Sequence, residues 1–199
     1  MEAWALRAME RWPNVPALFG WLGLDRRGRW LIKGEIITRP QIIDTINGNY
    51  EADAFGRWFF QNGPQRGFVS LEAAPLILSI DAGTLITHTR RAVLVPDRVF
   101  MDEEGGLYIS TEHGPGSLLD TDLDWALSNM KNADQPLDDA ALATALESPS
   151  GNPTGLEITL GARQLGVIRM DREALPQHLG FVLDPQPRGD ERVSTRIAD

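Results

Sequence analysis

An Asp-x-x-Gly motif recurs between short apolar runs and constrains the fold of this chain more than any other feature. It occurs at Asp25 in "DRRGRW" and at Asp53 in "DAFGRW", and a looser copy, "DEEGGL", begins at Asp102. An Asp side chain accepts a hydrogen bond from the backbone amide two residues on, and Gly takes the positive φ that a bulged loop needs. We therefore predict that each copy is a turn between two strands, with a structural role and not a catalytic one.

The order of elements around the motif indicates the fold class. The first copy is followed by a helix of about ten residues that Thr38 would cap and Asn47-Gly48 would end, and the third is followed by a helical pattern over 119–130. The second copy runs into strands 58–62 and 67–72 instead. The copies lie 28 and 49 residues apart, which is not the period of a solenoid. We predict an α+β fold of mostly antiparallel β-hairpins with short packed helices and a weak internal repeat of a ββα unit.

Periodicity predicts the remaining elements and the domain limits. A short amphipathic helix over 2–12 carries Trp4 and Trp12, and its apolar face packs on its own domain or on a neighbouring subunit. Strands are expected at 76–81, 84–89, 92–95 and 98–102, a helix at 137–147, a hairpin from Leu156 to Asp171, and a short strand in "GFVLDP". We expect a first unit over 1–81, a second over 82–184 and a polar tail over 185–199.

Composition and charge exclude several classes of function. The chain has no Cys, so disulfides, thiolate metal sites and cysteine nucleophiles are excluded. Residues 1–100 hold 12 basic and 10 acidic groups, whereas residues 101–199 hold 7 and 18, which argues against nucleic acid as a partner. No secretory signal and no apolar stretch of about 18 residues occurs, so we predict a cytoplasmic protein without a membrane partner.

Metal and cofactor motifs do not fit the sequence. His88, His113 and His178 show no ligand spacing, and the acidic run that begins at Asp120 has Trp125 where a calcium loop needs Gly. No Walker loop, nucleophile elbow or dinucleotide fingerprint occurs. We expect no metal and no cofactor. "GPGSLL", residues 114–119, offers a weak anion site at a helix N-terminus, or an ordinary loop that ends in an N-cap Ser.

One hairpin gathers polar groups between aromatic strands and is the candidate ligand site. Its functional interpretation is a recognition loop for a small anionic ligand or a peptide carboxylate, and its structural interpretation is a turn with solvated Arg side chains. The candidate ligand-binding residues are Arg57, Trp58, Gln61, Asn62, Gln65 and Arg66.

Residues 11–72 resemble an uncharacterised proteobacterial family that is carried as a domain of unknown function. The segment "FGWLGLDRRGRWLIKGEIITRPQIIDTI" is also similar to a second such family, in which an Asp-x-x-Gly-x-Trp hairpin precedes a helix. That resemblance implies a fold of repeated hairpin-and-helix motifs and a link to signalling. Neither family supplies catalytic residues.

Three functional hypotheses follow from the sequence. The first is a cytoplasmic binding or regulatory module that recognises a small ligand, for example an anion, or a protein partner. The second is an enzyme of the hydrolase type with a site near His113 and nearby carboxylates such as Glu112 or Asp102. The third is an oligomerisation protein without a ligand, for example a homodimer. The sequence favours a binding module over an enzyme and leaves the catalytic residues unassigned.

Overall fold

The chain folds into two compact units. The computed structural model describes residues 17–63 and 65–189. Unit 1 consists of the residues up to Ala73 together with those from Gly180 on, and unit 2 is Ala74–Leu179. The observed division thus falls at 73/74 and 179/180, whereas sequence placed it at 81/82 and 184/185. The expected helix over 2–12 lies outside the described residues.

Unit 1 is built on a six-stranded sheet with the order β3-β2-β1-β6-β5-β4. Its elements in chain order are β1 (Ala17–Leu24), β2 (Trp30–Ile32), β3 (Glu35–Ile36), α2 (Pro40–Gly48), β4 (Tyr50–Ala52), β5 (Trp58–Asn62) and β6 (Gln65–Leu71). Only the central pair, β1 and β6, is parallel, and the other neighbours are antiparallel. The long connection between the parallel strands places β1 and β6, the first and last strands of this sheet in chain order, side by side in its middle.

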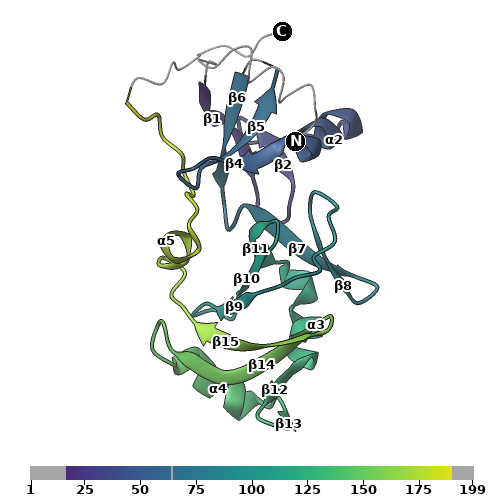
Figure 1. Cartoon of the computed structure of the whole chain (residues 1–199), viewed down its shortest axis with the longest axis vertical. Coiled ribbons are helices and arrows are strands. Elements are labelled where there is room, and N and C mark those ends of the chain that lie inside the picture. Colours follow the sequence, from purple (N-terminus) through teal and green to yellow (C-terminus); the bar gives the residue numbers. More distant parts are fainter. Residues whose placement is uncertain (1–16, 64, 190–199) are drawn as a thin grey trace. The chain divides into compact units, whose positions relative to one another are not determined.

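Unit 2 is built on a nine-stranded sheet with the order β13-β12-β14-β15-β9-β10-β11-β7-β8. Its elements in chain order are β7 (Leu76–Asp81), β8 (Thr84–Thr87), β9 (Arg98–Met101), β10 (Leu107–Thr111), β11 (Gly114–Leu118), the 3-10 turn η1 (Asp120–Asp122), α3 (Leu123–Ser128), β12 (Met130–Asn132), β13 (Gln135–Pro136), α4 (Asp139–Glu147), β14 (Pro153–Leu160), β15 (Arg163–Arg169) and α5 (Leu175–Leu179). Figure 1 shows these elements coloured along the chain.

The two units repeat one topology. The series β1-β2-β3-α2-β4-β5-β6 corresponds to β9-β10-β11-α3-β12-β14-β15, and the parallel pair of unit 1 corresponds to the parallel pair of β9 and β15. Unit 2 adds β13 and α4 between β12 and β14, and β7 and β8 beside β11. The expected α+β fold of antiparallel hairpins with short helices is confirmed. The weak ββα repeat that the sequence predicts is one part of this larger topological repeat.

Equivalent asparagines end the first helix of each copy. The side-chain amide of Asn49 donates to the carbonyl of Thr45 over 3.0 Å, and that of Asn129 donates to the carbonyl of Trp125 over 2.8 Å. The backbone carbonyl of each Asn in turn accepts a strand amide, from Gln61 in unit 1 and from Thr159 in unit 2. Each Asn thus satisfies an open carbonyl in the last turn of its helix and fastens the chain to the sheet.

All three Asp-x-x-Gly motifs are turns. Asp25 Oδ1 accepts the amides of Arg27 and Arg29 at 2.9 and 2.8 Å, and its Oδ2 lies 2.6 Å from Arg29 Nε. The turn at Asp53 repeats these contacts with Phe55 and Arg57. In both turns the Gly, at position 28 or 56, has a φ of +76°. The carboxylate therefore replaces two backbone acceptors that the turn lacks, and the expected turn chemistry is confirmed.

The third turn obtains its Arg from a distant part of the chain. Asp102 Oδ1 accepts the amides of Glu104 and Gly106, as in the other turns. Gly106 stands where the first two turns have Arg, and a Cβ there would lie 2.7 Å from Asp102 Oδ2. Arg172 instead donates from Nε and Nη2 to Asp102 Oδ2 over 2.9 and 2.8 Å. This buried carboxylate therefore joins the segment after β15 to the turn between β9 and β10.

A fourth turn of the same kind lies after β8, where the sequence pattern does not reveal it. The amide of Thr87 donates to the carbonyl of Arg91, and the amide of Arg90 donates to the carbonyl of Thr87. Thr87 Oγ1 accepts the Arg91 amide over 3.0 Å, as an Asp oxygen does elsewhere. Arg90 has a φ of +64° and takes the place of Gly. The motif is hidden because both of its diagnostic residues are replaced.

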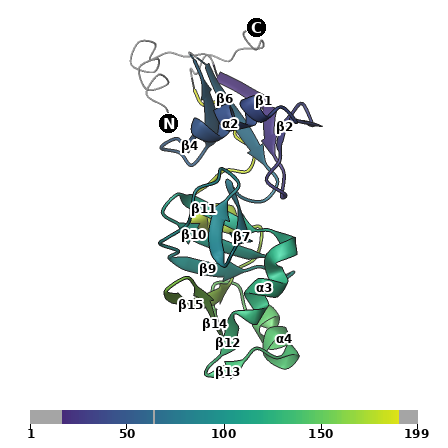
Figure 2. The same cartoon turned by 90° about the vertical axis from the view of Figure 1, so that its right-hand side faces the viewer.

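The two faces of the unit 1 sheet are covered differently. Toward α2, the Tyr50 ring centroid lies 4.9 Å from those of Trp30 and Trp58, and Trp30 Nε1 donates to Asn47 Oδ1 over 2.9 Å. On the other face, the ring of Phe68 stacks on Phe19 with centroids 4.6 Å apart. Figure 2 shows α2 in front of this sheet and the returning segment after Gly180 behind it.

The segment from Gly180 on is bound to unit 1 by hydrogen bonds with β6 and the second turn. The amide of Val182 donates to the carbonyl of Gly56, and the amide of Leu71 donates to the carbonyl of Leu183. Arg57 Nη1 reaches the carbonyl of Gln186 over 3.1 Å. "GFVLDP" is therefore an irregular segment that pairs with a strand end, and the expectation of a regular strand there is wrong.

Three other local expectations need correction. Arg39, not Thr38, is the N-cap of α2, and no side chain caps the helix. Residues 92–95 form only a single bridge through Ala92. "GPGSL" forms strand β11, and Ser117 therefore lies within a strand and is not an N-cap. The strand packs closely on β7, because Gly116 lies against Leu78 and leaves no room for a Cβ. Close packing between neighbouring strands decided this last case over local turn propensity.

We predict that Gly56→Ala destabilises unit 1 far more than Gly34→Ala. Both glycines have positive φ, so each change costs about 1 kcal/mol of strain. A Cβ on Gly56 would also overlap the carbonyl oxygen of Gly180, whereas nothing lies within 4 Å of a Cβ on Gly34. Urea unfolding should show an additional loss of about 2 kcal/mol for Gly56→Ala. Equal losses would contradict the docking of the returning segment.

We predict that Asp102→Ala lowers the free energy of unfolding by about 3 kcal/mol, because two turn amides and Arg172 lose a fully buried acceptor. The matched control is Asp97→Ala, whose exposed carboxylate lies 3.7 Å from Arg98 Nε and should contribute less than about 0.5 kcal/mol. Chemical denaturation of both variants checks the difference. A similar small loss for both would show that the turn does not depend on its carboxylate.

Candidate functional site

The six residues of the predicted recognition hairpin lie on both faces of the unit 1 sheet. Arg57 and Trp58 are consecutive in the chain and point to opposite sides. Trp58 packs beside Tyr50 on the α2 side, whereas the Arg57 guanidinium carbon lies 4.4 Å from the ring centroid of Phe68 on the other. Arg57 is buried and its Nη2 forms an ion pair with Asp53 Oδ2 at 2.7 Å. These two residues belong to the core and to a turn.

The other four residues stabilise the β5–β6 hairpin itself. Gln61 is fully buried, donates from Nε2 to the carbonyl of Gly63 over 2.8 Å and accepts Arg66 Nε over 3.3 Å. The Arg66 guanidinium carbon lies 4.9 Å from the ring centroid of Phe59. Asn62 is exposed and is paired with the buried Gln65 in the ladder. None of the six residues lines either of the two pockets described below.

The surroundings of His113 and Glu112 serve to hold a loop. Glu112 accepts the amides of Leu94 and Val95 over 2.6 and 3.2 Å, and His113 Nε2 lies 2.9 Å from the carbonyl of Ala92. Burial acts to raise the pKa of Glu112, but the amide hydrogen bonds outweigh it and hold the pKa below its usual range. The distance between His113 Nε2 and Glu112 Oε1 is 3.8 Å. Both side chains contact backbone groups of the 92–97 loop, and this structural role accounts for their positions without a catalytic one.

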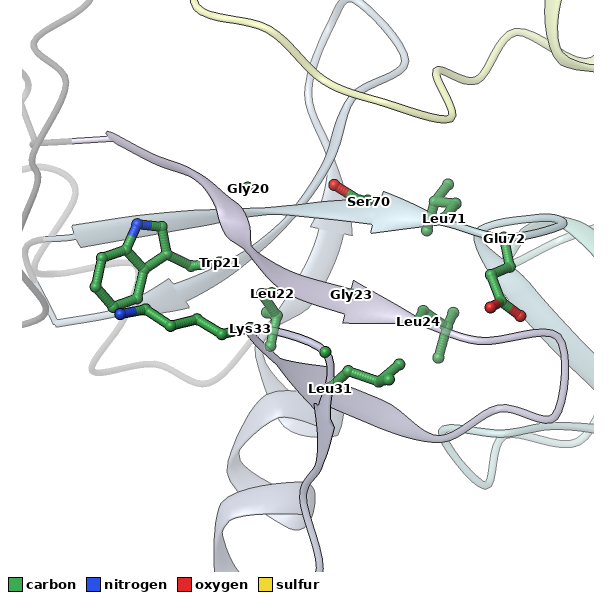
Figure 3. Close-up of a pocket in the computed structure, with 11 residues that line it drawn as sticks. Gly20, Trp21, Leu22, Gly23, Leu24, Leu31, Lys33, Ser70, Leu71 and Glu72 are labelled. Atoms are coloured by element: carbon green, nitrogen blue, oxygen red, sulfur yellow. The ribbon is translucent and has the colours of Figure 1, made fainter.

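A groove of about 280 Å³ opens on unit 1 between β1, β2 and β6 (Figure 3). Its residues are Gly20, Trp21, Leu22, Gly23, Leu24, Leu31, Lys33, Gly34, Ser70, Leu71 and Glu72. Cross-strand partners Leu31, Gly23 and Ser70 form a row. Because Leu31 follows Trp30, which contacts α2, the row lies on the sheet face away from that helix.

The two ends of the groove carry opposite charges. At one end the Lys33 ammonium lies 3.7 Å from the ring centroid of Trp21, and at the other lies Glu72, as Figure 3 shows. Glu72 Oε2 accepts the amide of Arg26 over 2.9 Å and lies 3.7 Å from its Nε. Within residues 17–63 and 65–189, no carboxylate pairs with Lys33. The groove therefore presents one uncompensated positive charge over an aromatic face.

Two glycines in the sequence of β1 are an indication of this groove. Gly20 and Gly23 interrupt an apolar strand, and a glycine inside a strand marks a bulge or a close approach. Gly20 has a φ of +69° at the irregularity in the β1–β6 register, and Gly23 leaves the floor of the groove without a side chain. The local pattern alone does not tell which groups surround such a glycine.

A second pocket, of about 230 Å³, lies on unit 2 between the end of α3 and the start of α4. Its lining consists of Leu127, Ser128, Leu137, Asp138, Asp139 and Leu142. Asp138 caps α4 by accepting the amide of Ala141 over 2.8 Å, and Asp139 lies in the first turn. The α3–α4 pocket thus combines three Leu side chains with two acidic ones.

His88 is a buried base that takes part in the sheet rather than in a site. Its Nδ1 accepts the amide of Ile77 over 3.1 Å, and its Nε2 is buried, although the residue as a whole is partly exposed. Burial, with a contribution from the nearby charge of Arg91, lowers the pKa of His88 to about 3. The imidazole is therefore neutral at physiological pH and acts as a structural acceptor.

The described residues contain neither a metal-binding cluster nor a membrane-spanning helix. Among residues 17–63 and 65–189, no group of three or more His, Cys, Asp or Glu side chains is arranged to hold a metal ion. Within that part of the chain, no helix is long and apolar enough to span a membrane.

Comparison with known proteins identifies the family and the fold. The model of a family described as "Protein of unknown function (DUF2946)" matches residues 1–186, and no curated protein matches. A crystal structure of a DUF1285 family protein from Silicibacter pomeroyi is 12% identical, with a TM-score of 0.53 over 80% of this chain and 86% of that chain. A DUF1285 family protein from Shewanella baltica is 14% identical, with a TM-score of 0.40 over 51% and 85%. The expected resemblance to uncharacterised families is confirmed, and the first structure supports the fold.

We predict that His88 makes stability depend on pH. Below about pH 6.5 the unfolded chain binds a proton at His88 that the folded chain does not, so stability falls as the pH drops toward 3. His88→Asn keeps an acceptor for the Ile77 amide but does not titrate. The stability advantage of the wild type over this variant should shrink by about 1.4 kcal/mol per pH unit between pH 6 and 4 in denaturant titrations. An advantage that is constant with pH would contradict the buried neutral imidazole.

Proposed function

The chain belongs to the DUF2946 family of unknown function, and we propose that it is a ligand-binding module whose unit 1 groove binds a small organic anion with an apolar body. The observation that carries the proposal is the Lys33 ammonium, held 3.7 Å from the centre of the Trp21 ring at the end of an apolar groove. An anionic group at Lys33 and an apolar group on Leu31 would together fit this arrangement.

The charge distribution supports an anion over a cation. Glu72, the acidic group of the groove, already accepts the Arg26 amide and lies next to the Arg26 guanidinium. Asp184 accepts a hydrogen bond from Ser70 at 3.3 Å and another from Gln186. Among the residues that line the groove, Lys33 is therefore the charge that remains available to a ligand. The Trp21 ring lies under its ammonium and helps to fix the position of that charge.

The size and floor of the groove indicate a small ligand. A volume of about 280 Å³ lies just below the range of about 300–1,000 Å³ that is usual for ligand pockets. The cross-strand row continues from Leu31 to Ile36 on the edge strand β3, and Ile36 is 45% exposed. The apolar part of the ligand thus has a surface to cover beyond the groove itself.

Lys33→Asn separates ligand binding from folding. Lys33 and Gly34 form a two-residue hairpin loop with φ values of +50° and +85°, which Asn-Gly adopts more readily than Lys-Gly. We predict that this variant keeps or gains about 0.5 kcal/mol of stability while it loses the anion. Ala82→Asn is the matched control, because Ala82-Gly83 forms the same kind of loop in unit 2, with φ values of +47° and +79°.

Thermal unfolding in the presence of phenylacetate, indole-3-acetate or 4-methylpentanoate measures the binding, with the corresponding amides as uncharged controls. A carboxylate should raise the melting temperature of the wild type and of Ala82→Asn, and its amide should not. Lys33→Asn should abolish the rise. If no carboxylate raises the wild-type melting temperature, or if the rise persists in Lys33→Asn, the proposed function is wrong.

A second variant tests the groove without touching the charge. A Cβ on Gly23 would lie 3.6 Å from the carbonyl oxygen of Ser70 and 3.8 Å from Leu31 Cβ, which are ordinary contacts. Gly23→Val therefore fits the strand but fills the floor of the groove, and it should abolish the carboxylate-induced rise. Gly166→Val, on a strand of unit 2 with nothing within 4 Å, is the control that should retain it.

A further inference from the structure

A loop of unit 2 presents apolar side chains to solvent. In the 92–97 loop, which connects the fourth turn to β9, the exposed fractions of Leu94 and Val95 are 76% and 44%. Leu94 is the most exposed large apolar residue in the described part of the chain. A single exposed Leu is ordinary on a protein surface, so its exposure alone carries no conclusion.

The backbone of this loop is held firmly, which distinguishes it from an ordinary surface loop. The backbone of residues 92–97 makes six polar contacts. The amides of Val93 and Asp97 donate to the carbonyls of Leu85 and Ser110, and those of Leu94 and Val95 donate to Glu112. The carbonyl of Ala92 lies 2.9 Å from His113 Nε2, and the carbonyl of Pro96 accepts Arg163 Nη1. A loop whose backbone amides and carbonyls are already satisfied is covered by a partner at a smaller desolvation penalty than a loop with open backbone groups. Its fixed conformation also lowers the entropy lost on association.

The surroundings of the loop are positively charged, against the trend of the chain. Residues 88–98 contain three Arg and one Asp, whereas residues 101–199 hold 7 basic and 18 acidic groups. Arg163, which binds the Pro96 carbonyl, adds a positive group, and Glu112, which binds the amides of Leu94 and Val95, adds a negative one, so that Arg residues still outnumber acidic residues around the loop. A surface that complements Leu94 and Val95 should therefore be a pocket that combines apolar side chains with carboxylates.

The α3–α4 pocket has these properties. Its lining includes three partly buried Leu residues and the exposed side chains of Asp138 and Asp139. Its volume of about 230 Å³ accommodates a branched aliphatic side chain. Because Leu94 is 76% exposed, it does not occupy the pocket of its own chain.

We propose that the chain self-associates by inserting the Leu94–Val95 tip of the 92–97 loop of one copy into the α3–α4 pocket of a second copy. The contact joins two different surfaces. It closes into a two-fold dimer where both loops engage reciprocally, and it forms head-to-tail chains where they do not. It involves only unit 2 and is independent of the ligand proposed for unit 1.

Sedimentation equilibrium of the full chain from about 10 μM to 1 mM tests the association directly. A contact of this small size predicts a Kd of about 100 μM, and its charge complementarity predicts a rise in Kd of about tenfold between 50 mM and 500 mM NaCl. A protein that remains monomeric throughout this range overturns the proposal.

Three variants locate the contact. Leu94→Asp places a carboxylate on the loop tip, and Asp139→Lys reverses one charge of the pocket lining. Each should raise the Kd at least about tenfold. Leu183→Asp makes the same change at a Leu of unit 1 that is 37% exposed, and its Kd should equal that of the wild type. Circular dichroism checks that each variant is folded. Wild-type association in both loop and pocket variants overturns the proposal.

A mixing experiment distinguishes this contact from any other mode of self-association. The Leu94→Asp copy retains a working pocket and the Asp139→Lys copy retains a working loop tip, so an equimolar mixture can form one intact contact. Sedimentation velocity with one fluorescently labelled variant should show heterodimers at concentrations where each variant alone is monomeric. If the mixture remains monomeric there, the loop tip and the α3–α4 pocket do not meet.

Discussion

The hydrogen bonds between an Asp carboxylate and the amides two and four residues on support the architecture of both units. Each such turn reverses the chain within five residues, so that its two strands can pair at once. In the turns at Asp25 and Asp53 the second carboxylate oxygen is neutralised by Arg from the same turn. At Asp102 the Arg comes from the segment after β15. One buried carboxylate therefore stabilises a turn and also binds that segment to it. The cost of burying that charge is offset by four hydrogen bonds.

The repeated topology shows how one arrangement serves two surroundings. In unit 1, Glu72 after β6 accepts the amide of Arg26 beside the first turn, whereas in unit 2 Glu103 beside the third turn accepts the amide of Arg172 after β15. The acid thus follows the last strand in unit 1 and lies in the turn in unit 2, where Met170, not Arg172, occupies the position of Glu72. The Arg172 amide, together with nearby positive charges, holds the pKa of Glu103 below its usual range. In both units an acidic and a basic residue join the turn to the end of the last strand, whichever of the two lies in the turn.

The surfaces on which the two proposals rest are the places where the repeats differ. In unit 1 a glycine at position 23 leaves a cross-strand row without a side chain, and the groove results. In unit 2 the added hairpin β7–β8 brings the fixed 92–97 loop, and the added α4 forms one wall of the acidic pocket. The shared framework is therefore structural, and function is expected in the local additions.

The sequence by itself determined the turns, the antiparallel hairpins and the helices that follow them, because each depends on the conformational preference of a few adjacent residues such as Asp25 and Gly28. It also excluded all chemistry that needs a thiol. Only the tertiary structure decided that β1 pairs with β6 in parallel, that Arg172 completes the third turn, and that Lys33 lies over Trp21. It also placed Arg57 and Trp58 on opposite faces of the sheet, although their proximity in the sequence had suggested a single site. These contacts join residues far apart in the chain, and burial and the satisfaction of polar groups, which no local pattern records, select among the possible partners.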